Sequence, residues 1–452
     1  MIIWGGQDQN GNSLKTGSRY NPSTDSWTTI STTNAPAARR YHSAVWTGRE
    51  MIVWGGDNGE VFDPFTSYFN DGGKYNPSTD SWTAISLVNA PEGRLFHSAV
   101  WTGAEMIVWS GQTRTGYLRS GGRYNPNSDT WTLTNITNAP AARYLHTTVW
   151  TGTAMIIWGG YSDNGVFDDG GRYNPATDSW SVINMTNAPT RRGGHTAVWT
   201  NSEMIVWGGY FNVGPLNTGA RYNPVTDSWT ATATSNAPEA RSEHLAVWTG
   251  SEMLVGPGLG VNFNVVNGGR YNPITDTWND ACDKNAPAAV RLFSAIWTGT
   301  EFVVWGGDDY SLHRINTGGR YSVQGPIQLL LEGSGPALDQ AAAVDSLLSI
   351  RDPFPVVNLD NVLNQGADRN TRVTVVVSNL LLLPGETSSS IIVHLVDGNN
   401  QGFDLPAEDV RPASTFVQVT FRLPDNLAIG TCTVSIKAHG KVSNAGTVRI
   451  RI

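Results

Sequence analysis

Hydrophobic and polar positions recur in a four-part unit over the first 325 residues. In one full unit the parts are His97–Trp101, which alternates, Glu105–Trp109, which is almost wholly apolar, a run ending in Gly-Gly-Arg-Tyr124, and a run opened by Asp129-Thr-Trp. Alternation predicts a strand with one buried face, and a short apolar run predicts a strand buried on both faces. Thr-Gly, Asn-Pro and Asn-Ala-Pro between the runs predict turns. We therefore expect four strands, a to d, in each unit.

All eighteen tryptophans fall on three positions of this unit, at the end of strand a, at the end of strand b and near the start of strand d. The tryptophans that end strand a, from Trp46 to Trp297, follow one another at steps of 55, 49, 49, 49 and 49 residues. A period near 50 with four short strands per unit is the signature of a β-propeller. Because the three positions recur in every full unit, we expect these side chains to pack between blades.

The two ends of the repeat are incomplete. Residues 1–36 supply strands b, c and d, whereas the last unit, which ends at Tyr321, supplies a, b and c. Seven b strands, six a strands and six d strands predict seven blades, one of which lacks its first strand. The run Met1–Trp4 matches Met51–Trp54, so we expect the missing strand, together with a secretion signal, upstream of Met1.

The glycine turns, the Gly-Gly-Arg-Tyr segment and the tryptophan after the c–d turn resemble kelch repeats, the propeller found in galactose oxidase-like proteins. The resemblance covers residues 1–325 and recurs six or seven times. It implies a seven-bladed kelch-type β-propeller for residues 1–325. It implies much less about activity, because propellers carry unrelated functions.

Residues 326–452 are expected to form a connector and a second all-β domain. The connector contains an expected strand at Ile327–Leu331 and a short helical pattern at Ala337–Leu348. Beyond Asp352, alternation and turns fit an immunoglobulin-like (Ig-like) β-sandwich. Its expected strands are Arg372–Val377, Ser390–Leu395, Thr415–Phe421, Thr431–Lys437 and Thr447–Ile452.

The stretches Arg422–Gly430 and Val442–Val448 resemble the terminal β-sandwich modules of secreted bacterial proteins, notably acidobacterial ones. This resemblance implies a secreted or cell-surface location for the chain. The sandwich would then serve as a spacer or attachment module.

Charge and composition argue against some classes of partner. Lys plus Arg number 30 against 38 Asp plus Glu, giving a net charge of −8. No basic excess is available for a polyanion, so we expect no nucleic-acid partner. The aliphatic run Leu380–Leu383 is far too short to cross a bilayer, so we expect no transmembrane segment. Cys282 and Cys432, which fall in different predicted domains, are expected to be thiols. The oligomeric state stays open.

An R-x-x-H motif recurs at the d–a junction, and its arginines are Arg39, Arg94, Arg143, Arg192 and Arg241. Strand a lies nearest the axis of a propeller, so these arginines could form an anion site at the mouth of the central channel. Alternatively, Arg and His hold the d–a turn by hydrogen bonds within and between blades.

The b–c loops, which share a face with the d–a turns, vary strongly in sequence and carry aromatic side chains. Exposed aromatic residues on variable loops of a rigid scaffold are typical of recognition surfaces. The alternative is that they cover the blade edges. The candidate ligand-binding residues are Phe62, Phe65, Tyr68, Phe69, Tyr117, Arg119, Tyr161, Phe167, Tyr210, Phe211, Tyr310 and His313.

No catalytic constellation accompanies these loops. The chemistry of galactose oxidase needs copper held by two His and two Tyr, one Tyr being cross-linked to a Cys. Tyr41-His42 is only one unit's version of R-x-x-H, and Cys282 has no evident Tyr partner. We therefore predict no catalytic residue, metal or cofactor, and a non-enzymatic protein that binds a protein or polysaccharide. A galactose oxidase-like copper enzyme and a purely structural envelope protein are the alternatives.

Overall fold

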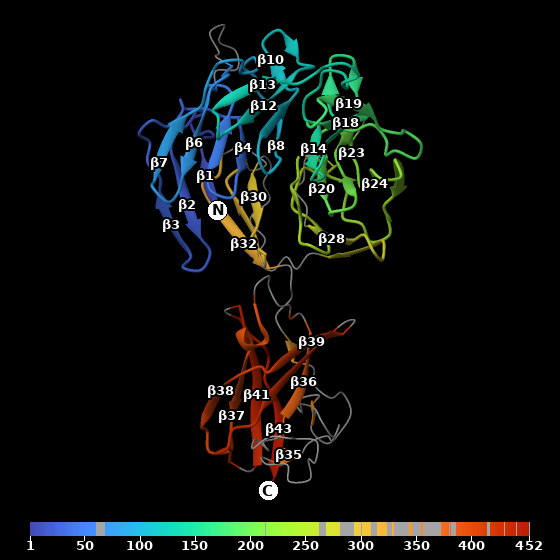
Figure 1. Cartoon of the computed structure of the whole chain (residues 1–452). Coiled ribbons are helices and arrows are strands. Elements are labelled where there is room, and N and C mark those ends of the chain that lie inside the picture. Colours follow the sequence, from blue (N-terminus) through green and yellow to red (C-terminus); the bar gives the residue numbers. More distant parts are fainter. Residues whose placement is uncertain are drawn as a thin grey trace. The chain divides into compact units, whose positions relative to one another are not determined.

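A computed structural model describes most of the chain. The described residues are 1–59, 68–212, 214–261, 268–280, 293–299, 301–308, 314–322, 328–329, 343–345, 354–355, 372–378, 380, 386–413, 416–428, 430–439 and 441–451. The chain divides into two compact units, Met1–Tyr321 and Ser322–Ile452 (Figure 1). Within the described residues all regular structure is β-strand, apart from 3₁₀ turns at Val261 and at Ser388–Ser390.

The first unit is a series of antiparallel sheets, numbered here 1 to 7 in chain order. Sheets 2 to 6 each have four strands in the predicted order a-b-c-d. Sheet 2 contains β4 (Ser43–Trp46), β5 (Met51–Trp54), β6 (Gly72–Asn76) and β7 (Ser81–Ala84), and sheet 3 contains β8 (Ser98–Trp101), β9 (Met106–Trp109), β12 (Gly121–Asn125) and β13 (Thr130–Leu133). Sheet 4 contains β14 (Thr147–Trp150), β15 (Met155–Trp158), β18 (Gly170–Asn174) and β19 (Ser179–Val182), and sheet 5 contains β20 (Thr196–Trp199), β21 (Met204–Trp207), β24 (Gly219–Asn223) and β25 (Ser228–Ala231). Sheet 6 contains β26 (Ala246–Trp248), β27 (Met253–Val255), β28 (Gly269–Asn272) and β29 (Thr277–Asp280).

Within the described residues, sheets 1 and 7 have three strands each, as the repeat predicts. Sheet 1 contains b, c and d: β1 (Ile2–Trp4), β2 (Gly17–Asn21) and β3 (Ser26–Thr29). Sheet 7 contains a, b and c: β30 (Ser294–Trp297), β31 (Glu301–Trp305) and β32 (Gly318–Ser322). Three b–c loops add small hairpins: β10 (Gln112–Thr113) with β11 (Gly116–Tyr117), β16 (Tyr161–Ser162) with β17 (Gly165–Val166), and β22 (Tyr210–Phe211) with β23 (Gly214–Pro215).

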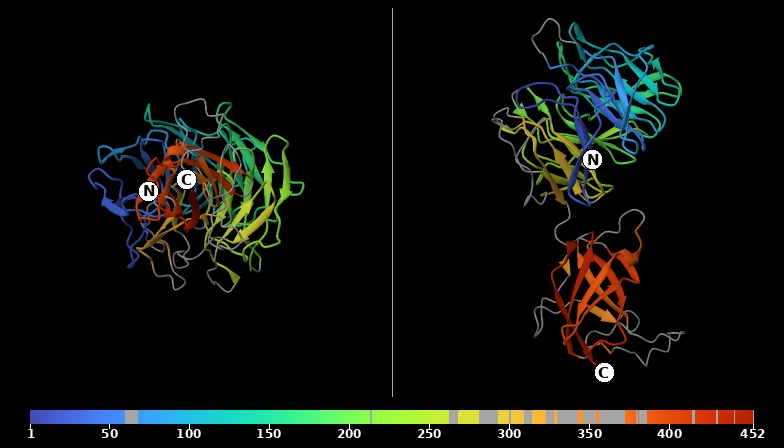
Figure 2. Two further views of the ribbon diagram at one scale, coloured as in Figure 1. Left: turned by 90° about the horizontal axis from the view of Figure 1, so that it is seen from below. Right: turned by 90° about the vertical axis from the view of Figure 1, so that its left-hand side faces the viewer.

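Successive sheets follow one another around a central axis. The a strands of neighbouring sheets contact each other from β4 through β8, β14, β20 and β26 to β30, which makes strand a the innermost. In Figure 2 the colours of the first unit run in chain order around this axis, and the last sheet lies beside the first. Strand b is buried in sheets 2 to 6, and in sheet 3 Met106, Ile107, Val108 and Trp109 are all 0% exposed.

Tryptophans join one sheet to the next. The strand-b ring of Trp109 in sheet 3 lies 4.3 Å from the strand-d ring of Trp180 in sheet 4, and Trp158 lies 4.4 Å from Trp229 in sheet 5. The predicted role in packing between repeats is confirmed for these two positions, because each apolar cluster mixes side chains from adjacent sheets. Strand-a tryptophans differ, because they end the inner strand at a surface turn. Trp46, for example, is 48% exposed.

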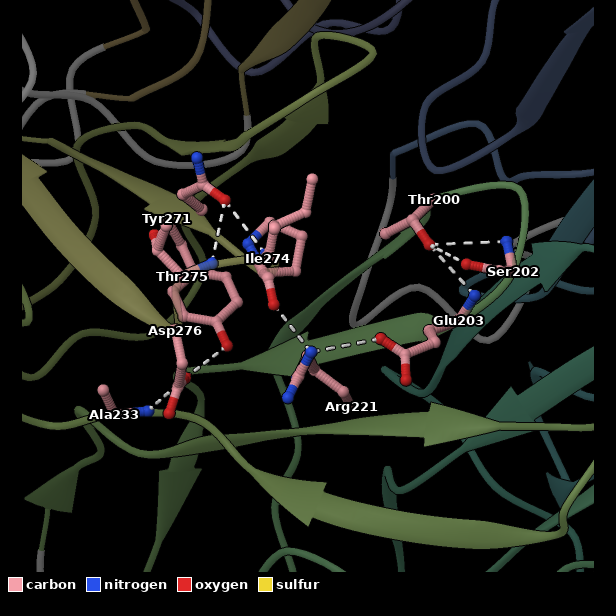
Figure 3. A network of polar contacts seen from close by, with 11 residues as sticks. Thr200, Ser202, Glu203, Arg221, Ala233, Tyr271, Ile274, Thr275 and Asp276 are labelled. Atoms are coloured by element: carbon pink, nitrogen blue, oxygen red, sulfur yellow. Dashed lines mark hydrogen bonds and ion pairs between the residues drawn. The ribbon is translucent and has the colours of Figure 1, made fainter. Parts of the chain in front are cut away.

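Polar bonds repeat at the same boundaries, as Figure 3 shows between sheets 5 and 6. Arg221 of strand c donates to the Pro273 carbonyl at 2.7 Å. Asp276 accepts a bond from the backbone N–H of Ala233, at the end of the preceding d strand, at 2.9 Å, and another from the Tyr271 hydroxyl at 2.6 Å. The same aspartate bond recurs at earlier boundaries through Asp80, Asp129, Asp178 and Asp227.

Sheet 7 meets sheet 1 through the same contacts. The Trp305 ring of strand b lies 4.3 Å from the strand-d ring of Trp27. Arg320 of strand c donates to the Pro22 carbonyl at 2.8 Å, as Arg221 does to Pro273. The boundary between the ends of the repeat therefore repeats the tryptophan contact and the arginine bond of the internal boundaries.

The second unit contains two sheets that share one hydrophobic core. One sheet has the order β33-β36-β40-β39, with β34 also on β36, and the other has the order β35-β43-β41-β37-β38, with β42 on β41. Their bounds are β33 (Gln328–Leu329), β34 (Ala343–Asp345), β36 (Arg372–Ser378), β39 (Asp409–Ala413), β40 (Phe416–Arg422), β35 (Phe354–Pro355), β37 (Ile392–Val396), β38 (Gly402–Pro406), β41 (Gly430–Ala438), β42 (Lys441–Val442) and β43 (Gly446–Arg451).

The five strands expected beyond Asp352 are present in this unit, with bounds shifted by one or two residues. The helix expected at Ala337–Leu348 is wrong where the segment is described, because Ala343–Asp345 forms strand β34. These residues pair with Val373–Val375 of β36. Pairing with an adjacent strand outweighs the helical propensity of an alanine-rich segment, which is a weak preference.

Candidate functional site

The b–c loops and the d–a turns lie on one face of the first unit, as predicted. In sheets 2 to 6 the residue that follows the motif arginine forms a β-bridge with the b–c loop of its own sheet. The bridges are Arg40 with Asp57, Leu95 with Gln112, Tyr144 with Tyr161, Gly193 with Tyr210, and Ser242 with Leu259. Variable loops and repeated turns therefore form one continuous surface around the ends of the inner strands.

The motif arginines lie below this surface. Arg143 is 0% exposed, and its guanidinium donates to the carbonyls of Ala141, Gly159 and Asp169 at 2.9–3.0 Å and to the Asp169 carboxylate at 2.8 Å. Arg39, Arg94, Arg192 and Arg241 are equally buried and bond the corresponding carbonyls. The arginines therefore hold the d–a turn by hydrogen bonds, which is the second of the two interpretations. The geometry does not favour an anion site at the channel mouth.

Two predicted loop aromatics cover these arginines. Phe69 lies 4.3 Å from the guanidinium of Arg39, and Phe167 lies 4.2 Å from that of Arg143, distances at which a cation is attracted to a ring face. Their backbone N–H groups bond the carbonyls of Gly56 and Gly160, and Leu118 makes the same bond in sheet 3. The repeated backbone bond places these three residues at equivalent positions of their loops.

The motif histidines connect the inner strands. His97 Nε2 lies 2.8 Å from the Ser43 hydroxyl of the preceding sheet. The pairs His146–Ser98, His195–Thr147 and His244–Thr196 repeat this contact. Burial, assisted by the adjacent arginine, lowers the pKa of His42 to about 4 and that of His146 to about 3. The imidazoles are therefore neutral at pH 7.

An arc of aromatic rings crosses sheets 2 to 4 on the loop face. We define the aromatic arc as Tyr41, Phe96, Tyr117, Tyr144 and Tyr161, all of which are partly exposed. The Tyr117 and Tyr144 rings stack at 4.9 Å with an interplanar angle of 3°. Tyr144 lies 5.7 Å from Tyr161 and 6.1 Å from Phe96, and Phe96 lies 4.4 Å from Tyr41. Each member therefore contacts at least one other.

Two members of the arc sit on left-handed backbone. Tyr41 has φ 54° and Phe96 has φ 53°, and the equivalent positions are Leu145 (50°), Gly194 (61°) and Glu243 (53°). Glycine adopts this conformation without strain, whereas a side chain there costs about 1–2 kcal/mol. Strained backbone of this kind is concentrated at functional sites in proteins.

The phenols of Tyr117 and Tyr161 are neutral hydrogen-bonding groups at pH 7. Burial raises the pKa of Tyr117, with smaller contributions from Tyr144 and Asp163. Burial also raises the pKa of Tyr161 to about 12, again with help from Tyr144. The Tyr161 hydroxyl donates to the Tyr210 carbonyl at 3.1 Å, which fixes its ring across the boundary with sheet 5.

The remaining predicted residues are dispersed. Tyr210 is 40% exposed, and Phe211 lies 5.8 Å from the guanidinium of Arg191. Arg119 donates to the Ala139 carbonyl at 3.0 and 2.6 Å, and Tyr68 bridges Asp57. Phe62, Phe65, Tyr310 and His313 lie outside the described residues.

Sequence reasoning omitted Tyr41, Phe96 and Tyr144 from the candidate binding residues. They occupy the two variable positions of R-x-x-H, which read Arg-Tyr, Leu-Phe and Tyr-Leu in sheets 2, 3 and 4. The two variable positions of R-x-x-H were expected on the same face as the b–c loops, so their aromatic residues could have been added to the candidates. The invariant Arg and His of the motif drew attention away from these positions.

The described part of the chain contains no group of three His, Cys, Asp or Glu side chains placed to hold a metal ion. It also contains no helix long and apolar enough to span a membrane. Cys432 is buried and free, and Cys282 lies outside the described residues.

Comparison with known proteins identifies the repeat. The family model described as the KLHDC2/KLHL20/DRC7 Kelch-repeats domain matches residues 1–185 and 96–307, which together cover about two thirds of the chain. No curated protein matches the chain. The repeated a-b-c-d sheets and the family match agree on residues 1–307, and the chain belongs to the kelch-repeat family.

Proposed function

We propose that Met1–Tyr321 is a seven-bladed kelch propeller that binds a protein segment through the aromatic arc. Kelch repeats generally mediate protein binding and are typically non-catalytic modules. Seven sheets in chain order, with the last in contact with the first, support seven blades. The two sheets and shared core of Ser322–Ile452 support an Ig-like sandwich that acts as a spacer or attachment module, and its resemblance to secreted modules supports a location outside the cytoplasm.

The aromatic arc is the observation that carries the proposal. Five partly exposed rings from three consecutive sheets form one connected row beside the ends of the inner strands. Rigid aromatic side chains supply a large contact area at low conformational entropy, which is why they dominate the energetics of binding surfaces. Neutral phenols within the row add hydrogen-bonding groups to the apolar faces.

The arrangement favours a protein segment over a polysaccharide. A sugar ring binds by stacking on a free aromatic face, but Tyr117 and Tyr144 stack on each other and each covers one face of its partner. The exposed ring edges and hydroxyls suit side chains and backbone amides of a peptide. Ring faces that remain open would accept an apolar or a cationic side chain.

A direct test measures binding to peptide and glycan arrays, using the wild-type protein and a Tyr144→Leu variant. Leucine occupies the equivalent position of the neighbouring sheet at Leu95, so the substitution preserves the repeat's own turn. For peptides bound by the wild type, we expect the variant to lose at least about tenfold in affinity, corresponding to about 1.4 kcal/mol.

The matched control is Val225→Ala. Val225 is 90% exposed on a c–d turn of the opposite face, so its loss is expected to leave peptide binding unchanged. Equal binding by the wild type and Tyr144→Leu would exclude the arc as the site. Selective binding to glycans alone would replace the protein ligand by a polysaccharide.

A further inference from the structure

The tryptophans that end the a strands differ from the other tryptophans in their contacts. Strand-b and strand-d tryptophans pair their rings across a boundary between sheets, as Trp109 does with Trp180. Strand-d indoles also donate to a main-chain carbonyl, as Trp180 does at 2.9 Å. Among the described residues, Trp101, Trp150 and Trp199 of the a strands have no aromatic ring partner, and no acceptor for the indole N–H. These three indoles therefore keep a donor and ring surface for another molecule.

The indole of Trp150 lines a pocket. It packs against the apolar cluster between sheets 3 and 4 and remains partly exposed. The pocket has a volume of about 430 Å³, which is within the range of roughly 300–1,000 Å³ of small-molecule sites. Its lining comes from the a–b and c–d turns of sheet 4 and from the a–b turn of sheet 3, and includes Trp150, Gly152, Thr153, Asn174, Ala176 and Thr102.

The polar groups of this pocket are neutral. The Asn174 carbonyl oxygen Oδ1 accepts the backbone N–H of Ala176 at 2.9 Å, which fixes the orientation of the side-chain amide. The amide nitrogen Nδ2 has no partner among the described residues, and both Asn174 and Thr153 are exposed. No charged side chain lines the pocket, all of whose lining residues belong to the described part of the chain. An uncharged ligand rich in hydroxyl groups suits such a lining, because amide and hydroxyl groups bond it without a charge.

The walls of the pocket are held by hydrogen bonds and an ion pair. Arg123 of sheet 3 donates to the Pro175 carbonyl of sheet 4 and lies 3.8 Å from the Glu105 carboxylate. Figure 3 shows the equivalent corner between sheets 5 and 6, where Arg221 connects Glu203 to the c–d turn of the next sheet. The charged groups are thus bonded to the scaffold. Walls that are already ordered lose little conformational entropy when a ligand binds.

Equivalent positions lie side by side on the face opposite the aromatic arc. Tyr144 precedes strand β14 and Trp150 ends it, so this strand separates the arc from the pocket. Strands β8, β14 and β20 are neighbours around the axis, and they end in Trp101, Trp150 and Trp199. The threonine after each of these tryptophans and the Asn-Pro of each c–d turn also repeat at steps of 49 residues. The face therefore presents the same groups to a ligand several times.

We infer that this face binds a neutral polysaccharide, with Trp150 as the stacking surface of one subsite and Trp101 and Trp199 as those of its neighbours. The apolar C–H face of a sugar ring packs on the electron-rich face of an indole. The sugar hydroxyls bond the indole N–H, the Asn174 amide and the Thr153 hydroxyl. Each subsite contacts the polymer weakly, and several subsites on one chain raise the overall affinity through a high effective concentration.

Affinity electrophoresis in gels that contain a soluble polysaccharide tests the inference. The neutral probes are mixed-linkage β-glucan, xyloglucan, galactomannan and pullulan, and alginate is the acidic comparison. We expect at least one neutral polysaccharide to retard the wild-type protein. For that polysaccharide, the triple variant Trp101→Ala, Trp150→Ala, Trp199→Ala is expected to lose at least about tenfold in affinity. Trp150→Ala alone is expected to lose less, because the neighbouring subsites still hold the polymer.

Two further variants separate loss of the site from loss of the fold. Asn174→Asp retains the oxygen that accepts the Ala176 N–H and removes the amide donor, so it is expected to weaken binding and to keep the wild-type melting temperature. Tyr144→Leu, in the aromatic arc, is expected to bind the polysaccharide as the wild type does.

Three results would overturn the inference. They are no retardation of the wild type by any neutral polysaccharide, equal affinity of the wild type and the triple variant, and a loss of affinity in Tyr144→Leu that the triple variant does not show. Peptide binding is a separate readout, which Trp150→Ala is expected to leave unchanged. Failure of this inference is therefore distinguishable from failure of the proposed function.

Discussion

The Trp305 ring of the last sheet lies 4.3 Å from the Trp27 ring of the first, in the same b-to-d relationship that joins Trp109 to Trp180. Residues near the two ends of the repeat thus form a contact of the same kind as neighbouring units. Arg320 adds the corresponding polar bond to Pro22. Each sheet is therefore held from both sides.

Replacing a strand-b tryptophan should be far more damaging than replacing a strand-a tryptophan. Trp109 is 0% exposed and contacts the next sheet, so Trp109→Ala should lower the free energy of unfolding by about 3–5 kcal/mol. Trp46 is 48% exposed, so Trp46→Ala should cost about 1–2 kcal/mol. Denaturant unfolding measures both, and equal losses would contradict the packing described here.

Replacing Arg143 by lysine should destabilise the protein. One lysine ammonium cannot reproduce the bonds that the guanidinium makes to three carbonyls and a carboxylate. We expect Arg143→Lys to lower the free energy of unfolding by about 2–3 kcal/mol, because buried carbonyls lose their donors. The control is Arg119→Lys at an exposed arginine, which should have little effect. If Arg143→Lys proves as stable as the control, the arginine does not hold the turn.

The propeller unit should lose stability as the pH falls from about 6.5 towards 4. The pKa of His42 is about 4 and that of His146 about 3 in the folded chain, against about 6.5 when unfolded. Between these values the unfolded chain binds more protons, so the free energy of unfolding decreases as the pH decreases, by up to about 1.4 kcal/mol per pH unit for each buried histidine. Urea unfolding at several pH values measures the slope, and His146→Gln should make it shallower.

Alanine substitutions at two adjacent glycines should lower the stability of the protein for different reasons. Gly194 has φ 61°, and a Cβ added there would meet no atom nearer than 3.7 Å, so Gly194→Ala should cost about 1 kcal/mol through backbone strain alone. A Cβ at Gly193 would overlap the Tyr161 ring. Adding Tyr161→Ala should therefore rescue Gly193→Ala but not Gly194→Ala. A double-mutant cycle that shows equal coupling for both would contradict this placement of Tyr161.

The sequence was sufficient to predict the strands of the repeat, because its turns and tryptophans mark every boundary. It also predicted the incomplete first and last sheets. The segment Ala343–Asp345 could not be assigned locally, because its strand exists only through pairing with Val373–Val375. Tertiary partners of this kind have no short-range signature.

The sequence predicted that the b–c loops and the d–a turns share one face, and it named only two members of the aromatic arc among the candidate residues. Tyr117 and Tyr161 were recognisable as loop aromatics, whereas Tyr144 was hidden inside a motif with fixed ends. The burial of Arg143 was equally unpredictable, because whether a guanidinium faces solvent or neighbouring carbonyls depends on the path of a separate b–c loop. The contact between Tyr117 and Tyr144 required the register between sheets 3 and 4.

The hydrogen bonds of the strand-c arginines all run in one direction along the series of sheets. Arg172 donates to the Pro224 carbonyl and Arg221 to the Pro273 carbonyl, so at both boundaries the earlier sheet supplies the donor and the later sheet the acceptor. Neighbouring repeats consequently share one kind of interface. A repeat can be duplicated or exchanged without a new interface, while the sequence of its b–c loop diverges. Such a scaffold can acquire a new ligand one loop at a time while its architecture stays unchanged.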